Sequence, residues 1–83
     1  MKQLDGKVAI VTGGARGVAR GIAAAFVKAG ASVVIVDREE DLGRATEAEL
    51  SAFGKVAFLP MDLSRHAELP SIVDFAVERF GRL

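Results

Sequence analysis

Three short apolar runs recur along the chain, at residues 8–11, 33–36 and 56–59. Each run is continuous rather than alternating, which is typical of strands buried on both faces of a parallel sheet. Stretches with helical periodicity follow each run, and strands separated by helices pair in parallel through right-handed crossovers. The pattern therefore predicts an α/β fold: a three-stranded parallel sheet in the order 3-2-1, with the first strand at an edge and helices on the faces.

Each expected helix carries an apolar stripe at helical spacing, and we expect this stripe to face the sheet. The second stripe is the weakest, because Glu49 interrupts it. Gly30, Gly54 and Gly81 follow the stripes, where a left-handed residue commonly caps a helix. The stripes consist of Val18, Ile22, Ala25, Phe26 and Ala29 in the first helix, Leu42, Ala45, Leu50 and Phe53 in the second, and Leu69, Ile72, Val73, Ala76, Val77 and Phe80 in the third.

The composition fits a folded domain and excludes several kinds of partner. Apolar residues make up 51% of the chain, too many for a disordered tail. Eleven Lys and Arg balance eleven Asp and Glu, so no basic field is expected to bind nucleic acid. The longest apolar run, residues 22–27, is far too short to span a membrane, and the absence of cysteine suits a reducing compartment. We therefore expect a cytoplasmic domain with neither a nucleic-acid nor a membrane partner.

The length of 83 residues is about half that of an ordinary domain, since domains cluster at roughly 100–150 residues. The chain ends directly after its third helix, where a doubly wound sheet would continue with another strand. An apolar first strand at an open edge would expose unpaired backbone groups. We therefore expect residues 1–83 to be the N-terminal part of a single larger domain, completed by the rest of a parent chain or by self-association through the first strand.

A glycine-rich turn, TGGARGVA at residues 12–19, joins the first strand to the first helix. Phosphate binding requires backbone N–H groups at the positive end of a helix, with no side chain in the way, and glycine meets this need. The spacing differs from the common Gly-x-Gly-x-x-Gly fingerprint. The turn is therefore a candidate pyrophosphate site, and the alternative is a glycine turn that only reverses the chain.

Asp37 ends the second strand, near the spacing of about 20 residues at which an acid reaches the adenine ribose of a dinucleotide. A carboxylate accepts both ribose hydroxyl protons and repels a 2′-phosphate. Asp37 and Glu40 also form the pattern of a capping box for the second helix. Both roles stay open at this point.

Asp62 and Leu63 follow the third strand, at the same carboxyl edge of the sheet as the glycine turn and Asp37. Ligands of open α/β sheets bind beyond this edge, so the convergence favours a single site. Asp62 alone could equally cap the third helix. His66 has no second ligand or acid–base partner at a useful spacing, and we expect it to be solvated.

Four segments together resemble the short-chain dehydrogenase/reductase family: IVTGGARGV at 10–18, VDR at 36–38, DLS at 62–64 and FGRL at 80–83. The resemblance covers the whole chain and implies a Rossmann-type βαβαβα half-domain with a dinucleotide as partner. It places Gly13, Arg16, Gly17 and Val18 around the pyrophosphate and adenosine. It also implies that Asp37 binds the ribose and that Asp62, with the backbone of Leu63, contacts adenine.

The chain departs from the family pattern in two ways. Ala19 stands where a third glycine is usual, and a single methyl group is expected to be tolerated. The family's Asn-Asn-Ala-Gly segment and its catalytic Ser, Tyr and Lys are absent, and the chain contains no tyrosine at all. The resemblance therefore implies the adenosine-binding half of an NAD(P)-dependent oxidoreductase without catalytic residues of its own. The alternatives are a free-standing nucleotide- or partner-binding module without catalysis and a flavodoxin-like interaction domain.

The charges around the second strand end favour NAD over NADP. Asp37 would face the 2′ position of the ribose, and Glu39, Glu40 and Asp41 add negative charge nearby. Arg38 and Arg16 act in the opposite direction, because a guanidinium can pair with a 2′-phosphate. We expect the carboxylate that is aimed at the ribose to outweigh a flexible arginine.

Overall fold

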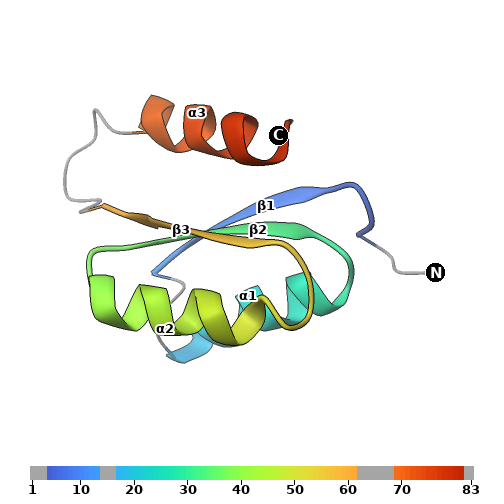
Figure 1. The fold of residues 1–83 in the computed structure, drawn as a ribbon, viewed down its shortest axis with the longest axis horizontal. Coiled ribbons are helices and arrows are strands. Elements are labelled where there is room, and N and C mark those ends of the chain that lie inside the picture. Colours follow the sequence, from blue (N-terminus) through green and yellow to red (C-terminus); the bar gives the residue numbers. More distant parts are fainter. Residues whose placement is uncertain (1–3, 14–16, 62–68, 82–83) are drawn as a thin grey trace.

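The computed structural model describes residues 4–13, 17–61 and 69–81 of the chain. Strands and helices alternate in the predicted order (Figure 1). Within these ranges, no helix combines the length and the apolar character needed to cross a membrane. The elements are β1 (Val8–Thr12), α1 (Gly17–Lys28), β2 (Ser32–Asp37), α2 (Glu40–Leu50), β3 (Val56–Pro60) and α3 (Leu69–Phe80).

The three strands form one parallel sheet in the order β1-β2-β3, which confirms both the α/β class and the predicted order 3-2-1. β2 lies in the centre, where Ile35 is opposite Val11 of β1 and Phe58 of β3. All but the first residue of β2 are buried. Because both faces of this strand are covered, its apolar run is continuous rather than alternating.

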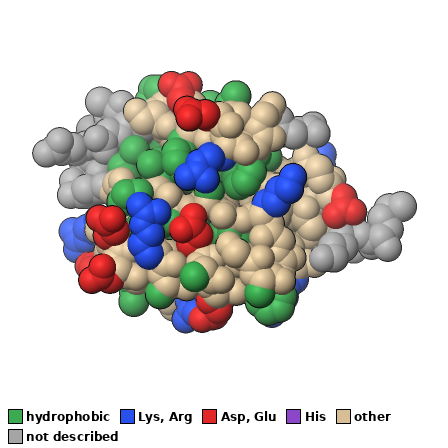
Figure 2. Space-filling view, in the orientation of Figure 1, with side chains coloured by type: hydrophobic (Ala, Val, Ile, Leu, Met, Phe, Trp, Pro, Cys, Tyr) green, Lys and Arg blue, Asp and Glu red, His purple; other side chains and the backbone are tan. Residues whose placement is uncertain are grey.

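Different helices cover the two faces of the sheet (Figure 1). α1 and α2 pack on one face, where Val33 and Ile35 of β2 join the larger core. α3 packs on the other face, where Val34 and Val36 join a smaller core. Hydrophobic side chains remain at the surface between α3 and the sheet, whereas charged side chains of both signs gather over α2 (Figure 2).

The face of α1 that packs on the sheet differs from the predicted one. Ala23 and Val27 are fully buried, whereas Val18 is 82% and Ile22 44% exposed. The predicted stripe is right only in part: Phe26 is partly buried against the core, whereas the other large residues of the stripe are exposed, because α1 is apolar on more than one side. A small residue such as Ala23 allows the helix to approach the sheet closely, which periodicity alone does not reveal. Ala19 is partly buried against the same core.

The inner face of α2 is also different from the prediction, with only Leu50 in common. Gly43 and Thr46 are the other buried residues of this helix. The ring of Phe58 in β3 occupies the space beside Gly43, so the helix packs on the sheet through a residue without a side chain. The remaining members of the predicted stripe are exposed, namely Leu42, Ala45 and Phe53.

The inner face of α3 agrees with the prediction in part. Ile72 and Ala76 are buried against the sheet, whereas Val73 and Val77 are exposed.

The helix ends follow the predicted glycines in two cases of three. Gly30 and Gly81 have φ values of 102° and 78°, in the left-handed region expected of a glycine cap. The cap predicted at Gly54 is wrong, because α2 already ends at Leu50 and its C-cap, Ser51, has a right-handed conformation.

Candidate functional site

The carboxyl ends of the three strands are joined by backbone hydrogen bonds that continue past the sheet. The Gly13 N–H donates to the Val36 carbonyl over 2.6 Å, and the Met61 N–H donates to the Asp37 carbonyl over 3.0 Å. Adjacent strands lie about 4.8 Å apart. The glycine turn after β1, the end of β2 and the end of β3 are therefore held side by side at one edge of the sheet, on the left in Figure 1.

The turn between β1 and α1 depends on glycine for its backbone conformation. Gly13 and Gly17 have φ values of 66° and 45°, which side-chain-bearing residues rarely adopt. No described atom lies within 4 Å of a Cβ placed on either glycine, apart from their chain neighbours. As far as the described residues go, the space beside these two glycines is therefore open, and α1 begins there without an acid in its first turn. This end of α1 can therefore accept an anion.

Asp37 is the most constrained polar side chain at this edge. Its exposed fraction is only 6%. One carboxylate oxygen, Oδ1, accepts the backbone N–H of Glu39 over 3.0 Å. The other, Oδ2, is buried and has no hydrogen-bond partner in the described part of the chain. A buried unpaired acceptor costs about 1–3 kcal/mol, more when it is charged, so this oxygen is suited to receive a donor from a ligand.

The capping box predicted from Asp37 and Glu40 is wrong. α2 begins at Glu40 with Glu39 as its N-cap, and the Glu39 side chain makes no capping hydrogen bond. Asp37 instead belongs to β2, and its carboxylate closes a short turn of the Asx type through the Glu39 amide. The sequence reasoning missed this role of the Glu39 backbone, although an Asp placed two residues before a helix start is a signal for such a turn.

Four of the seven predicted site residues lie in the described part of the chain, and all four are at the same edge. Gly13 and Gly17 form the turn, Asp37 ends β2, and Val18 presents an exposed apolar side chain in the first turn of α1. The other predictions concern residues outside the described ranges, namely Arg16, Asp62 and Leu63, and His66 lies outside them too.

A glycine turn that opens a helix, next to a buried acid at the end of the adjacent strand, is the arrangement found at ligand sites of Rossmann-type folds. The chain belongs to the short chain dehydrogenase family, because the model of that family matches residues 7–83. Over 78 residues it is 49% identical to L-fucose dehydrogenase of Bos taurus, an alignment that covers 94% of this chain and 28% of the bovine protein.

Two solved structures of related enzymes have the same fold over nearly all of this chain. One is a short chain dehydrogenase/reductase from Burkholderia phymatum in complex with NAD (TM-score 0.90, 32% identity, 100% of this chain and 30% of that chain). The other is RhlG of Pseudomonas aeruginosa in an NADP active-site complex (TM-score 0.79, 37% identity, 90% of this chain and 30% of that chain). The chain thus spans less than a third of the length of each of these three relatives.

Proposed function

We propose that this chain is the adenosine- and pyrophosphate-binding part of an NAD(P)-dependent oxidoreductase that transfers hydride between nicotinamide and an alcohol or carbonyl substrate. The observation that carries the proposal is the buried Asp37 carboxylate, which has one oxygen fixed by the Glu39 amide and the other without a partner in the described chain. A ribose hydroxyl is a donor of the right chemistry for that oxygen. The related enzymes solved with NAD and NADP support the same class of cofactor.

Each residue of the site has a specific part in this proposal. The backbone at Gly13 and Gly17 accommodates the pyrophosphate, whose charge the amino end of α1 stabilises. Val18 packs against the cofactor, and Asp37 accepts the ribose hydroxyls. Arg16, Asp62 and Leu63 complete the binding of pyrophosphate and adenine, as the family resemblance implies.

The proposal assigns binding, and not proton transfer, to this chain. When bound, the cofactor supplies or accepts the hydride, and a carbonyl oxygen then needs a nearby proton donor. Residues 1–83 include no tyrosine. Because the family resemblance implies a tyrosine as the proton donor, the proposal assigns this donor to a part of the enzyme outside these residues. The lack of cysteine is consistent with action in the cytoplasm.

The proposed cofactor is NAD rather than NADP. The Asp37 carboxylate is buried at the end of β2 and cannot turn away to solvent. A 2′-phosphate would bring a second negative charge against it, whereas Arg38 is exposed and free to rotate. The geometry therefore favours a ribose with both hydroxyls unmodified.

Calorimetric titration with parts of the cofactor tests the proposed function. NAD and ADP-ribose are expected to bind the chain with dissociation constants within about threefold of each other, because the nicotinamide half contributes little to the contacts this chain offers. Nicotinamide mononucleotide is expected not to bind. Equal binding of nicotinamide mononucleotide, or no binding of ADP-ribose to the folded chain, would contradict the proposal.

Two matched variants distinguish a role of the glycine turn in cofactor binding from the general cost of placing alanine at a positive φ. Gly17→Ala and Gly81→Ala each place alanine at a positive φ with open space around the Cβ, so both are expected to lower the free energy of unfolding by about 1–2 kcal/mol. Only Gly17 lies at the proposed pyrophosphate site, while Gly81 follows α3, whose carboxyl end points away from the carboxyl ends of the strands (Figure 1). ADP-ribose affinity is expected to fall about tenfold in Gly17→Ala and to remain unchanged in Gly81→Ala. An equal loss of affinity in the two variants would show that the turn is not part of the cofactor site.

We also propose that the open side of the sheet is completed by the rest of a longer protein. Val73 and Val77 of α3 are exposed, and Val8 and Ile10 of β1 are only partly buried against the same core. Without that completion, these surfaces are expected to drive self-association. Sedimentation velocity should therefore show a species larger than the monomer whose fraction of the total rises with concentration, and a monomer at millimolar concentration would contradict this expectation.

A further inference from the structure

The two outer strands of the sheet differ in how their free edges are treated. On either side of β3, the Lys55 carbonyl accepts the Val33 N–H, and the Met61 N–H donates to the Asp37 carbonyl. Residues 55, 57, 59 and 61 therefore direct their backbone groups toward β2, because backbone groups alternate in direction along a strand. Residues 56, 58 and 60 direct theirs away from the sheet.

The outward donors of β3 are almost all removed or occupied. Pro60 has no N–H to offer. The Phe58 N–H donates to Oε2 of Glu47 in α2 over 2.9 Å, a contact between residues eleven positions apart. Only the N–H of Val56, at the start of the strand, is left free by this arrangement.

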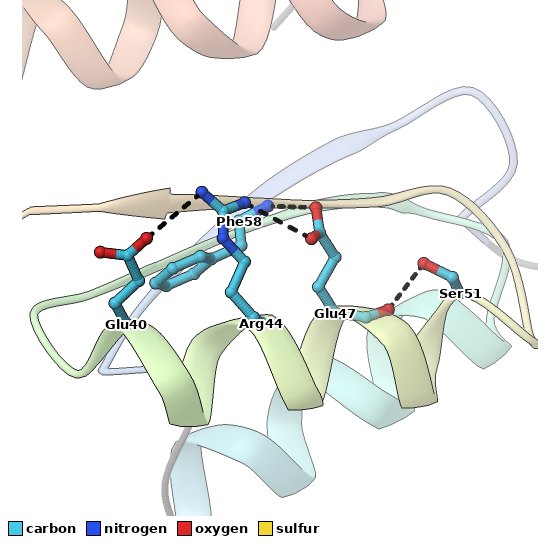
Figure 3. Close-up of polar contacts among 5 residues, drawn as sticks. All are labelled: Glu40, Arg44, Glu47, Ser51 and Phe58. Carbon is cyan, nitrogen blue, oxygen red and sulfur yellow. Dashed lines mark hydrogen bonds and ion pairs between the residues drawn. The ribbon is translucent and has the colours of Figure 1, made fainter.

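The Glu47 carboxylate is itself held in place by its neighbours (Figure 3). Its Oε1 lies 3.7 Å from the Arg44 guanidinium, which also lies 3.8 Å from a carboxylate oxygen of Glu40. The same guanidinium sits 5.2 Å from the centre of the Phe58 ring. The Arg44 and Glu47 side chains of α2 therefore lie over the edge of β3, and Glu47 is the more buried of the two.

The free edge of β1 has no comparable cover among the described residues. Its inward groups are set by the Lys7 carbonyl, which accepts the Ser32 N–H, and by Gly13. By the same alternation, the N–H groups of Val8, Ile10 and Thr12 point outward. None of these three has a hydrogen-bond acceptor in the described structure.

We propose that Glu47 is an edge guard: it occupies the Phe58 N–H so that a second copy of this chain cannot add a strand along β3. An unpaired edge of a sheet is a template for strand addition. A chain with one open edge can only form pairs, whereas a chain with two open edges can grow into longer assemblies. Glu47 thus confines growth of the sheet to the β1 side. This inference does not depend on cofactor binding.

Amide hydrogen exchange tests the guard directly. In the unmodified chain, at a concentration where it is monomeric, the Phe58 amide is expected to exchange at least about tenfold more slowly than the Val56 amide, because a hydrogen bond to a charged acceptor must open first. Val56 is a matched control, since both amides point outward from the same strand. Equal exchange of the two amides would overturn the proposal without any variant.

Three substitutions distinguish protection of the β3 edge by Glu47 from a general effect of changing α2. Glu47→Ala is expected to abolish the difference between Phe58 and Val56 and to convert pairs into larger assemblies in sedimentation. Glu47→Gln keeps an acceptor at the same place and is expected to retain part of the Phe58 protection. Glu40→Gln removes one charge from the same helix and is expected to change neither readout.

The outcome remains decisive if Glu47→Ala does not fold. In that case Glu47→Gln carries the test, together with the comparison of amides in the unmodified chain. Assemblies no larger than pairs in a folded Glu47→Ala variant, or unchanged Phe58 exchange in it, would show that Glu47 does not guard the edge.

Discussion

Gly43→Ala is expected to lower the free energy of unfolding by about 2 kcal/mol, in spite of the better helix propensity of alanine. A Cβ at this position would lie 2.6 Å from Cδ1 of Phe58 and closer still to Cε1 and Cζ. The Phe58 ring is fully buried, so it cannot move aside freely. Contacts this close belong at the upper end of the overpacking range, about 3 kcal/mol, of which the propensity gain offsets about 1 kcal/mol. Urea unfolding followed by far-ultraviolet circular dichroism measures the difference.

A matched control exists in α1. Gly21 is exposed and has open space around its Cβ position. Gly21→Ala is therefore expected to raise the free energy of unfolding by about 0.5–1 kcal/mol. Replacing the ring with a smaller side chain, in a Gly43→Ala, Phe58→Leu double variant, should recover part of the lost stability. If Gly43→Ala were as stable as Gly21→Ala, the close approach of α2 to β3 would be wrong.

Asp37→Ala is expected to weaken NAD binding and to relieve NADP binding, with a combined change of about 1–3 kcal/mol, or about 5- to 150-fold in the ratio of dissociation constants. The loss for NAD comes from the hydrogen bond to a charged, buried acceptor. The relief for NADP comes from removal of a negative charge beside the 2′-phosphate. Fluorescence or calorimetric titration with both cofactors gives the ratio.

Asp37→Asn separates the charge from the turn. An asparagine oxygen can still accept the Glu39 N–H, so the turn and the stability should be preserved, while the change in cofactor preference should persist. An unmodified protein that binds NADP more tightly than NAD, and that loses this preference in Arg38→Ala, would refute the ribose role of Asp37.

The strand order was expected because 3-2-1 is the usual order in nucleotide-binding folds. The strands themselves were predictable because each gives a strong, local signal: the runs 8–11, 33–36 and 56–59 contain no polar residue. The glycine turn at Gly13 and Gly17 was predictable for a similar reason, since the required backbone conformation is rare for other residues. The site at the carboxyl edge then follows from the parallel topology.

The packing of the helices was not predictable in the same way. Ala23 and Gly43 form the contact faces of α1 and α2, but small residues give a weak periodic signal and are outweighed by exposed valines and leucines. The bond from Phe58 to Glu47 joins two elements through a side chain, and no spacing rule within one element reveals it. The Asx-type turn of Asp37 was missed because the same residues also match a capping box.

The order of the strands across the sheet is also their order along the chain. Each strand therefore pairs with one that has already been synthesised, and the helix that connects them is finished before the pair closes. Once residue 37 has been made, β1, α1 and β2 are all present, and β3 can add to an existing surface instead of waiting for a distant segment. Contacts between elements that are close in sequence favour rapid folding, and domains can begin to fold from the N-terminus during synthesis. The topology thus suits a folding nucleus that assembles during synthesis on the ribosome.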